Sequence, residues 1–75
     1  MSVRISKRDL KAIESRVNSR LKKIELRVSY RYGYVAIDIY RDGVNCDTLI
    51  AGLTNKEAFN ILECIERVLM LEEIG

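Results

Sequence analysis

Apolar residues recur at steps of three and four in the first third of the chain, which is the spacing of one helical face. Ser6 precedes this stripe as a candidate N-cap, and Asp9 places an acidic side chain in the first turn, where the helix dipole favours it. We therefore predict a helix over about residues 6–22. Its apolar stripe consists of Leu10, Ile13, Val17, Leu21 and Ile24.

The apolar period then falls to two, which is typical of strands with one buried face. Residues 24–32 alternate in this way, from Ile24 to Tyr32. Residues 34–40 alternate again after a turn that contains Gly33. The pattern predicts two neighbouring strands, each with one apolar and one polar face.

A third strand is predicted over residues 44–52, and Gly52 ends it. Asp42-Gly43 precedes it and favours a two-residue hairpin turn, because both central residues of that turn need a positive φ. The alternation in this strand is weaker than in the other two, because Leu49 falls opposite Val44, Cys46 and Ile50.

The last segment predicts a second helix. Thr54 and Glu57 have the spacing of a capping box, in which each side chain bonds the other residue's backbone N–H. The apolar face that follows consists of Ala58, Ile61, Leu62, Ile65, Val68 and Leu69. Four further residues lie off this face, where they pack on the first helix or form a subunit contact: Phe59, Cys64, Met70 and Leu71.

These elements give the order α-β-β-β-α and an α+β fold class. We expect a three-stranded antiparallel meander with two helices on one face. A chain of 75 residues suits one domain, which we place over residues 1–75. The other sheet face is expected to be open and to carry Arg27, Arg31, Tyr34, Asp38, Tyr40 and Leu49.

Composition narrows the class of protein. The chain is 48% hydrophobic and 32% charged, which is typical of a globular domain and too apolar for a disordered one. Its apolar runs are shorter than the ~20 residues of a membrane span, and its first ten residues lack the apolar core of a signal peptide. We therefore expect a cytoplasmic protein. Cys46 and Cys64 have no metal-like spacing and are predicted to be reduced thiols.

The charge is distributed unevenly. Residues 1–31 hold ten basic and three acidic residues, a net charge of +7, whereas residues 32–75 hold three and eight, a net charge of −5. Such asymmetry can mark a surface for nucleic acid or for an acidic partner. It is equally consistent with two halves that neutralise each other in the folded domain.

Catalytic chemistry finds little support. The chain has no histidine, the commonest acid–base residue, and its glycines form no phosphate-binding loop. Asp38 and Asp47 could approach each other across the hairpin and hold a cation, but the sequence leaves the strand register open. A solvated helix face explains the remaining carboxylates better than a catalytic pair does: Glu63, Glu66, Glu72 and Glu73. We expect no enzyme, no cofactor and no metal site.

Three surfaces could bind a partner. Cations and aromatic rings on the open sheet face could form a protein hot spot, stack on bases, or be ordinary strand-surface residues: Arg27, Arg31, Tyr34 and Tyr40. The basic candidates for nucleic acid are Arg4, Arg8, Lys11, Lys22 and Lys56. The candidates for a homodimer contact are Phe59, Met70 and Leu71.

The order α-β-β-β-α resembles the double-stranded RNA-binding domain. The segment "TNKEAFN" at residues 54–60 is similar to the start of that family's last helix. The resemblance implies that Lys56 contacts phosphates. Asn55 and Phe59 stand where the family has two further lysines, and the loop after the first strand is shorter than the family's.

Residues 34–69 also resemble small phage and prophage proteins, a size class that includes anti-CRISPR proteins. The likeness centres on "AGLTNKEA" at residues 51–58. It implies a non-enzymatic phage or mobile-element accessory protein that inhibits a host protein or protein–nucleic-acid complex by occupying its surface. This is the leading functional hypothesis. The alternative is a nucleic-acid-binding module that uses the basic N-terminal half.

Overall fold

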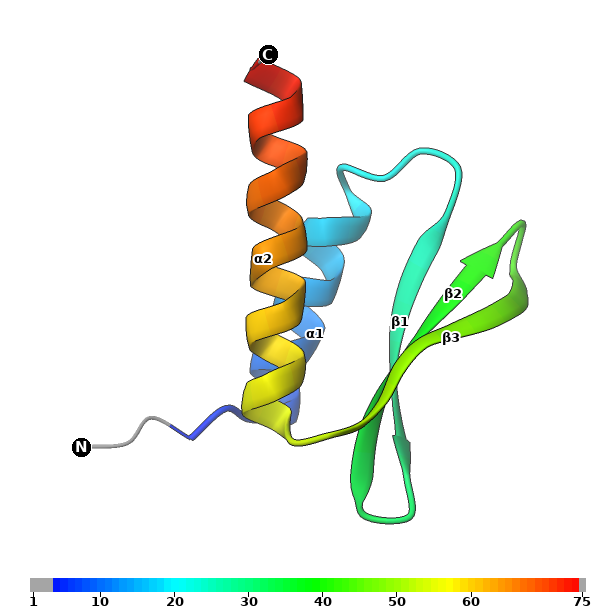
Figure 1. Ribbon diagram of the computed structural model, residues 1–75, viewed down its shortest axis with the longest axis vertical. Coiled ribbons are helices and arrows are strands. Elements are labelled where there is room, and N and C mark those ends of the chain that lie inside the picture. The colour runs from blue at the N-terminus through cyan, green and yellow to red at the C-terminus, as the bar shows by residue number, and fades with distance from the viewer. Residues whose placement is uncertain (1–3, 75) are drawn as a thin grey trace.

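The computed structural model describes residues 4–74 and has the predicted order of elements (Figure 1). The three strands form one antiparallel sheet with the order β1-β2-β3. This arrangement confirms the predicted α+β meander. The elements are α1 (Lys7–Asn18), β1 (Glu25–Arg31), β2 (Tyr34–Arg41), β3 (Val44–Leu53) and α2 (Asn55–Ile74).

Both helices start at capping boxes. Thr54 and Glu57 exchange the two predicted hydrogen bonds, at 2.8 and 3.1 Å. Ser6 and Asp9 do the same at the start of α1. We expected Asp9 only to interact favourably with the helix dipole, but it also completes a capping box with Ser6.

Helix α1 is shorter than predicted, because it ends at Asn18 instead of residue 22. The chain turns there, and the N–H groups of Arg20 and Leu21 each donate a hydrogen bond to the carbonyl three residues earlier, at Val17 and Asn18. Helix α2 continues to Ile74, beyond the apolar stripe that ends at Leu69. Its last turns therefore extend past the end of α1 (Figure 1).

Two tight turns join the strands. Asp42 and Gly43 have φ values of 53° and 78°, as the sequence predicts for a two-residue hairpin. The turn between β1 and β2 is built in the same way, from Tyr32 at 44° and Gly33 at 82°. The glycine in this turn was expected, whereas a tyrosine in the left-handed region was not.

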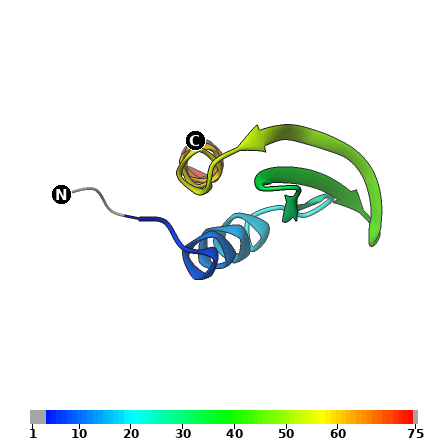
Figure 2. The same ribbon diagram turned by 90° about the horizontal axis from the view of Figure 1, so that it is seen from below.

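Strand β3 coils around β2 because it has more residues than β2 along the length over which the two strands pair. The pairs Arg41–Val44, Ile39–Asp47, Ile37–Ile50 and Val35–Leu53 advance by two residues on β2 for every three on β3. Each extra residue is a bulge, and bulges increase the local twist. Figure 2 shows β3 arching over β2. This three-residue step explains why the alternation in β3 is weak in the sequence.

The core lies between the sheet and the two helices, which cover the same face (Figure 2). The starts of the helices lie side by side, since the Asn55 side chain donates to the Ile5 carbonyl at 2.9 Å. All five elements contribute to one buried cluster: Leu10, Ile13, Val17, Leu26, Val35, Ile37, Leu53, Ala58 and Leu62.

Candidate functional site

The open face of the sheet is the first candidate surface. The strand register places Arg27 opposite Asp38, Arg31 opposite Tyr34, and Glu25 opposite Tyr40. Leu26, Val35 and Ile37, which alternate with these residues, belong to the core under the helices. The four predicted partner-binding residues therefore share the face that the helices leave uncovered.

Two of these side chains hold each other in place. The Arg27 guanidinium lies 4.2 Å from the centroid of the Tyr40 ring, within the range of a cation–π contact. Arg27 also donates to a Glu25 carboxylate oxygen at 3.0 Å, and this bond raises the pKa of Arg27. Arg27 and Tyr40 thus form an ordered, partly exposed pair.

The sequence led us to expect an Asp38 side chain that is open to solvent on this face, but the structure buries it. Its side chain is only 2% exposed. Arg31 donates to it at 2.7 Å, Ser29 at 3.0 Å and Thr48 at 3.1 Å. The donors come from both neighbouring strands, and the coiling of β3 sets Thr48 opposite Asp38. The carboxylate therefore ties the three strands together beneath the surface.

The cation site considered for Asp38 and Asp47 does not form. Asp38 pairs with Thr48, whereas Asp47 pairs with Ile39, a neighbouring position on β2. Neighbouring strand positions point to opposite faces, so the two carboxylates diverge. Within residues 4–74, no cluster of three metal-ligating side chains occurs.

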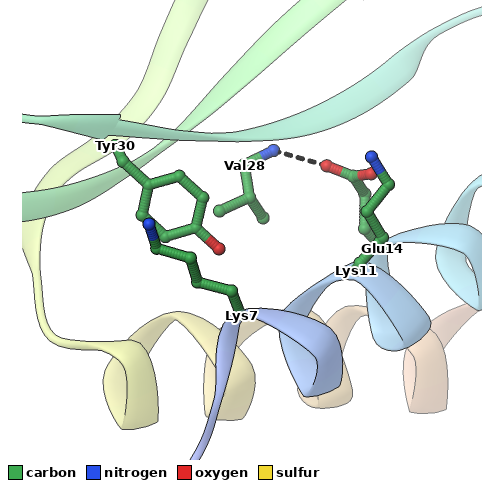
Figure 3. Close-up of a pocket in the computed structure, with 5 residues that line it drawn as sticks. All are labelled: Lys7, Lys11, Glu14, Val28 and Tyr30. Carbon is green, nitrogen blue, oxygen red and sulfur yellow. Dashed lines mark hydrogen bonds between the residues drawn. The ribbon is translucent and has the colours of Figure 1, made fainter.

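The outer edge of β1 is covered by α1, which the sequence provided no reason to expect. Asn18 accepts from the Leu26 N–H at 2.8 Å and donates to the Leu26 carbonyl at 2.9 Å. Glu14 accepts from the Val28 N–H at 2.7 Å (Figure 3). The two side chains stand four residues apart on α1 and take the place of a neighbouring strand. The four-residue spacing of Glu14 and Asn18 was the signal in the sequence that could have indicated a covered strand edge, but polar pairs with this spacing are common on helix surfaces.

A hollow of about 250 Å³ lies beside this edge and is lined by Lys7, Lys11, Glu14, Val28 and Tyr30 (Figure 3). The Lys7 ammonium lies 4.7 Å from the centroid of the Tyr30 ring. Burial raises the pKa of the Tyr30 phenol, and the Glu14 carboxylate adds to the shift. One predicted nucleic-acid residue, Lys11, also lines the hollow, where its side chain lies beside Glu14 (Figure 3).

The other predicted nucleic-acid residues lie elsewhere. Lys22 shares a polar hollow with Lys23 and Arg41, where the α1–β1 loop meets the β2–β3 turn. The remaining three belong to the segments where the helices start: Arg4, Arg8 and Lys56. Three of the five cations thus lie at the end of the molecule where the helices start, whereas Lys11 and Lys22 line two different hollows.

The acidic residues of α2 are not all a solvated face. Glu66 is buried, and Arg16 donates to both of its carboxylate oxygens, at 2.8 and 3.0 Å. These hydrogen bonds lower the pKa of Glu66 and raise that of Arg16. Glu73 pairs with Arg20, which lies in the turn that follows α1. Glu66 therefore joins α2 to α1, and the solvated-face interpretation is wrong for it, whereas the Glu73 side chain is 53% exposed.

The three candidates for a dimer contact differ in how exposed their side chains are. Met70 and Leu71 are exposed, at 41% and 69%. Phe59 is half-buried and packs against the core of its own chain. Both cysteines are exposed free thiols.

Comparisons with models of protein families, with curated proteins and with solved structures returned no match to this chain. The resemblances to the double-stranded RNA-binding domain and to small phage proteins therefore stay predictions. Within residues 4–74, neither α1 nor α2 is long and apolar enough to cross a membrane.

Proposed function

We propose that this chain is a non-enzymatic binding protein that covers part of another protein with the open face of its sheet. The observation that carries the proposal is the ordered pair of Arg27 and Tyr40, 4.2 Å apart, on the same face as Arg31 and Tyr34. Tyrosine and arginine are enriched among residues that dominate protein interfaces. Side chains that are already ordered lose less conformational freedom on binding.

The finer part of the proposal concerns the biological setting. We propose a cytoplasmic accessory protein of a phage or mobile element that inhibits a host protein or protein–nucleic-acid complex by occupying its surface. The support for this setting is the resemblance of residues 51–58 to small phage proteins.

The test is capture of a partner from bacterial lysate, followed by affinity measurement with the purified partner. Tyr40→Ala and Tyr34→Ala should each weaken binding by about 1–3 kcal/mol. Arg41→Ala is the matched control, because Arg41 is exposed at the end of β2 and its side chain points to the opposite sheet face. Arg31 is unsuitable as a probe of binding, since its removal also unpairs the buried Asp38.

Nucleic-acid binding is the second candidate, favoured by the hollow in which Lys7 lies against Tyr30 and which Lys11 also lines. Nuclease treatment of the lysate separates the two functions. Capture that survives nuclease and is weakened by Tyr40→Ala supports the protein partner. Capture that is lost with nuclease and with Lys11→Glu, but is indifferent to Tyr40→Ala, would replace the proposal with the nucleic-acid module.

A further inference from the structure

The loop between α1 and β1 and the turn between β2 and β3 lie at the end of the molecule opposite to the helix starts (Figure 1). Between them is a hollow of about 470 Å³, lined by Lys22, Lys23, Arg41 and Asp42. Three cationic side chains and one carboxylate give this hollow a net charge of +2. We call these four residues the basic hollow.

The fold fixes the two segments that form the basic hollow. Glu25 pairs with Tyr40 in the register of β1 and β2, so the residues just before β1 lie beside those that follow Tyr40. The loop is anchored at both ends, because the Leu21 N–H donates to the Asn18 carbonyl and the Asn18 side chain bonds to Leu26. The β2–β3 turn is a tight two-residue hairpin. Backbone geometry thus brings the cations together.

The positive charge of the basic hollow is left unneutralised. Four arginines elsewhere in the fold each pair with a carboxylate. Within residues 4–74, by contrast, Lys22, Lys23 and Arg41 take part in no ion pair. In the same part of the chain, the backbone N–H groups of the two lysines donate no hydrogen bond. A hollow lined by charges of one sign attracts ions of the opposite sign, so its free donors suit an anion.

We propose that the basic hollow binds the terminal phosphate group of a small molecule, such as a nucleotide or a sugar phosphate. A phosphate monoester carries a charge of about −1.5 to −2 at pH 7, which balances the net charge of the hollow. A phosphodiester of a nucleic-acid backbone carries only one negative charge and balances it less well.

The size of the basic hollow also favours a small molecule. Its volume of about 470 Å³ lies within the range of small-molecule pockets, roughly 300–1,000 Å³, and leaves room for the group that carries the phosphate. The hollow is separate from the open sheet face, since the Arg41 side chain points to the opposite face of the sheet. The proposal therefore does not depend on the proposed function.

Titration followed by amide NMR spectra tests the site and its ligand class. Adenosine monophosphate and ribose phosphate should each cause saturable shifts at residues 22–23 and 41–43. Adenosine and ribose, which lack the phosphate, should leave these resonances unchanged. The tighter of the two phosphates identifies the source as a nucleotide or a sugar phosphate.

Charge variants test the role of each side chain. Lys23→Gln and Arg41→Gln should each raise the dissociation constant of adenosine monophosphate by about three- to ten-fold, because each removes a charge-assisted hydrogen bond. Asp42→Asn should lower it, since this change removes the one repelling carboxylate and Asn-Gly favours the same turn. Lys56→Gln is the matched control, because it removes one positive charge at the other end of the molecule. The same spectra show whether each variant is folded.

Four results would overturn the proposal. The absence of saturable shifts with both phosphates would show that the hollow binds no phosphate group. Lys56→Gln that weakens binding as much as Arg41→Gln would show general attraction to a basic protein. Sulfate that binds as tightly as adenosine monophosphate would show an adventitious ion only. A thymidine oligonucleotide without terminal phosphates that binds the hollow as tightly would assign it to a nucleic-acid backbone.

Discussion

At the residue scale, the two hairpin turns have the same backbone but different side chains. Gly43 takes its positive φ at no steric cost, whereas Tyr32 takes a φ of 44° with a bulky side chain. The Tyr32 side chain is fully exposed, so packing does not offset this strain.

Substitutions at these two turns should therefore change stability in opposite directions. Gly43→Val should lower the free energy of unfolding by about 1–2 kcal/mol, and Tyr32→Asn should raise it by up to about 1 kcal/mol. Urea unfolding measures both. Coincident curves for wild type and Gly43→Val would contradict the hairpin geometry.

Asp38 is the other residue whose environment predicts a clear effect. Arg31→Ala removes a charged hydrogen bond to a carboxylate that is 2% exposed, and should cost roughly 1.5–3 kcal/mol of unfolding free energy. Arg27→Ala is the control, because its partner Glu25 is half-exposed and solvent screens an exposed ion pair. Adding Asp38→Asn to Arg31→Ala should recover part of the loss. Equal stability of the two single variants would argue against the buried network.

At the element scale, the sheet has two edges of different character. Helix α1 covers the β1 edge with Asn18 and Glu14, while β3 is interrupted by bulges. Covering and bulging are two ways in which proteins keep strand edges from pairing with other chains.

Asn18→Ala should uncover the β1 edge. The Leu26 N–H and carbonyl would lose their partners, at a cost of about 1–3 kcal/mol, and the open edge should increase aggregation. Chemical unfolding and light scattering on warming measure the two effects. Ser19→Ala is the control, because the Ser19 hydroxyl donates only to the Arg16 carbonyl in its own helix end. A soluble Asn18→Ala protein of wild-type stability would show that the edge needs no cover.

The pairing of α1 with α2 through Arg16 and Glu66 should make stability depend on pH. Because the hydrogen bonds from Arg16 lower the pKa of Glu66, the folded protein keeps this carboxylate charged where the unfolded chain takes up a proton. The contribution is complete above the ordinary glutamate pKa of about 4.3 and is lost as the pH falls through the lower folded value.

Glu66→Gln should therefore melt below wild type at neutral pH, and the difference should shrink as the pH falls below about 4. Thermal melts over an acid series measure this. Glu72→Gln, an exposed glutamate of the same helix, is the control and should leave the profile unchanged. A difference from wild type that stays constant with pH would remove the ion pair as its cause.

At the scale of the whole molecule, the uneven charge of the sequence is partly neutralised by folding. Arg16, Arg20 and Arg31 from the basic half pair with Glu66, Glu73 and Asp38 from the acidic half. Two of the predicted nucleic-acid cations, Lys11 and Lys22, line separate hollows.

Binding to generic duplex DNA or RNA should therefore be weak, with a Kd above roughly 10 μM at physiological salt. Fluorescence anisotropy with labelled duplexes across a salt series measures it. Sub-micromolar affinity that falls steeply with salt, and is lost in Arg8→Glu with Lys11→Glu, would reverse the order of the two candidate functions.

Local signals in the sequence predicted the order of elements, both helix starts and the Asp42–Gly43 turn. They succeed because capping, positive φ and apolar spacing depend on a few neighbouring residues. The same signals identified Arg27, Arg31, Tyr34 and Tyr40 as one face, since strand alternation is also local. They misplaced the end of α1, because that end is fixed by a turn and by the bonds of Asn18 to Leu26 in the strand that follows.

What the sequence by itself determined is thus the set of elements and the faces they present. The tertiary structure alone decided which charged residues are buried and paired within the fold. The burial of Asp38 depends on the three-for-two register of β3, and the pairing of Glu66 depends on how α1 lies beside α2. Both join residues of different elements, and a charged side chain looks the same in sequence whether solvent or a partner covers it.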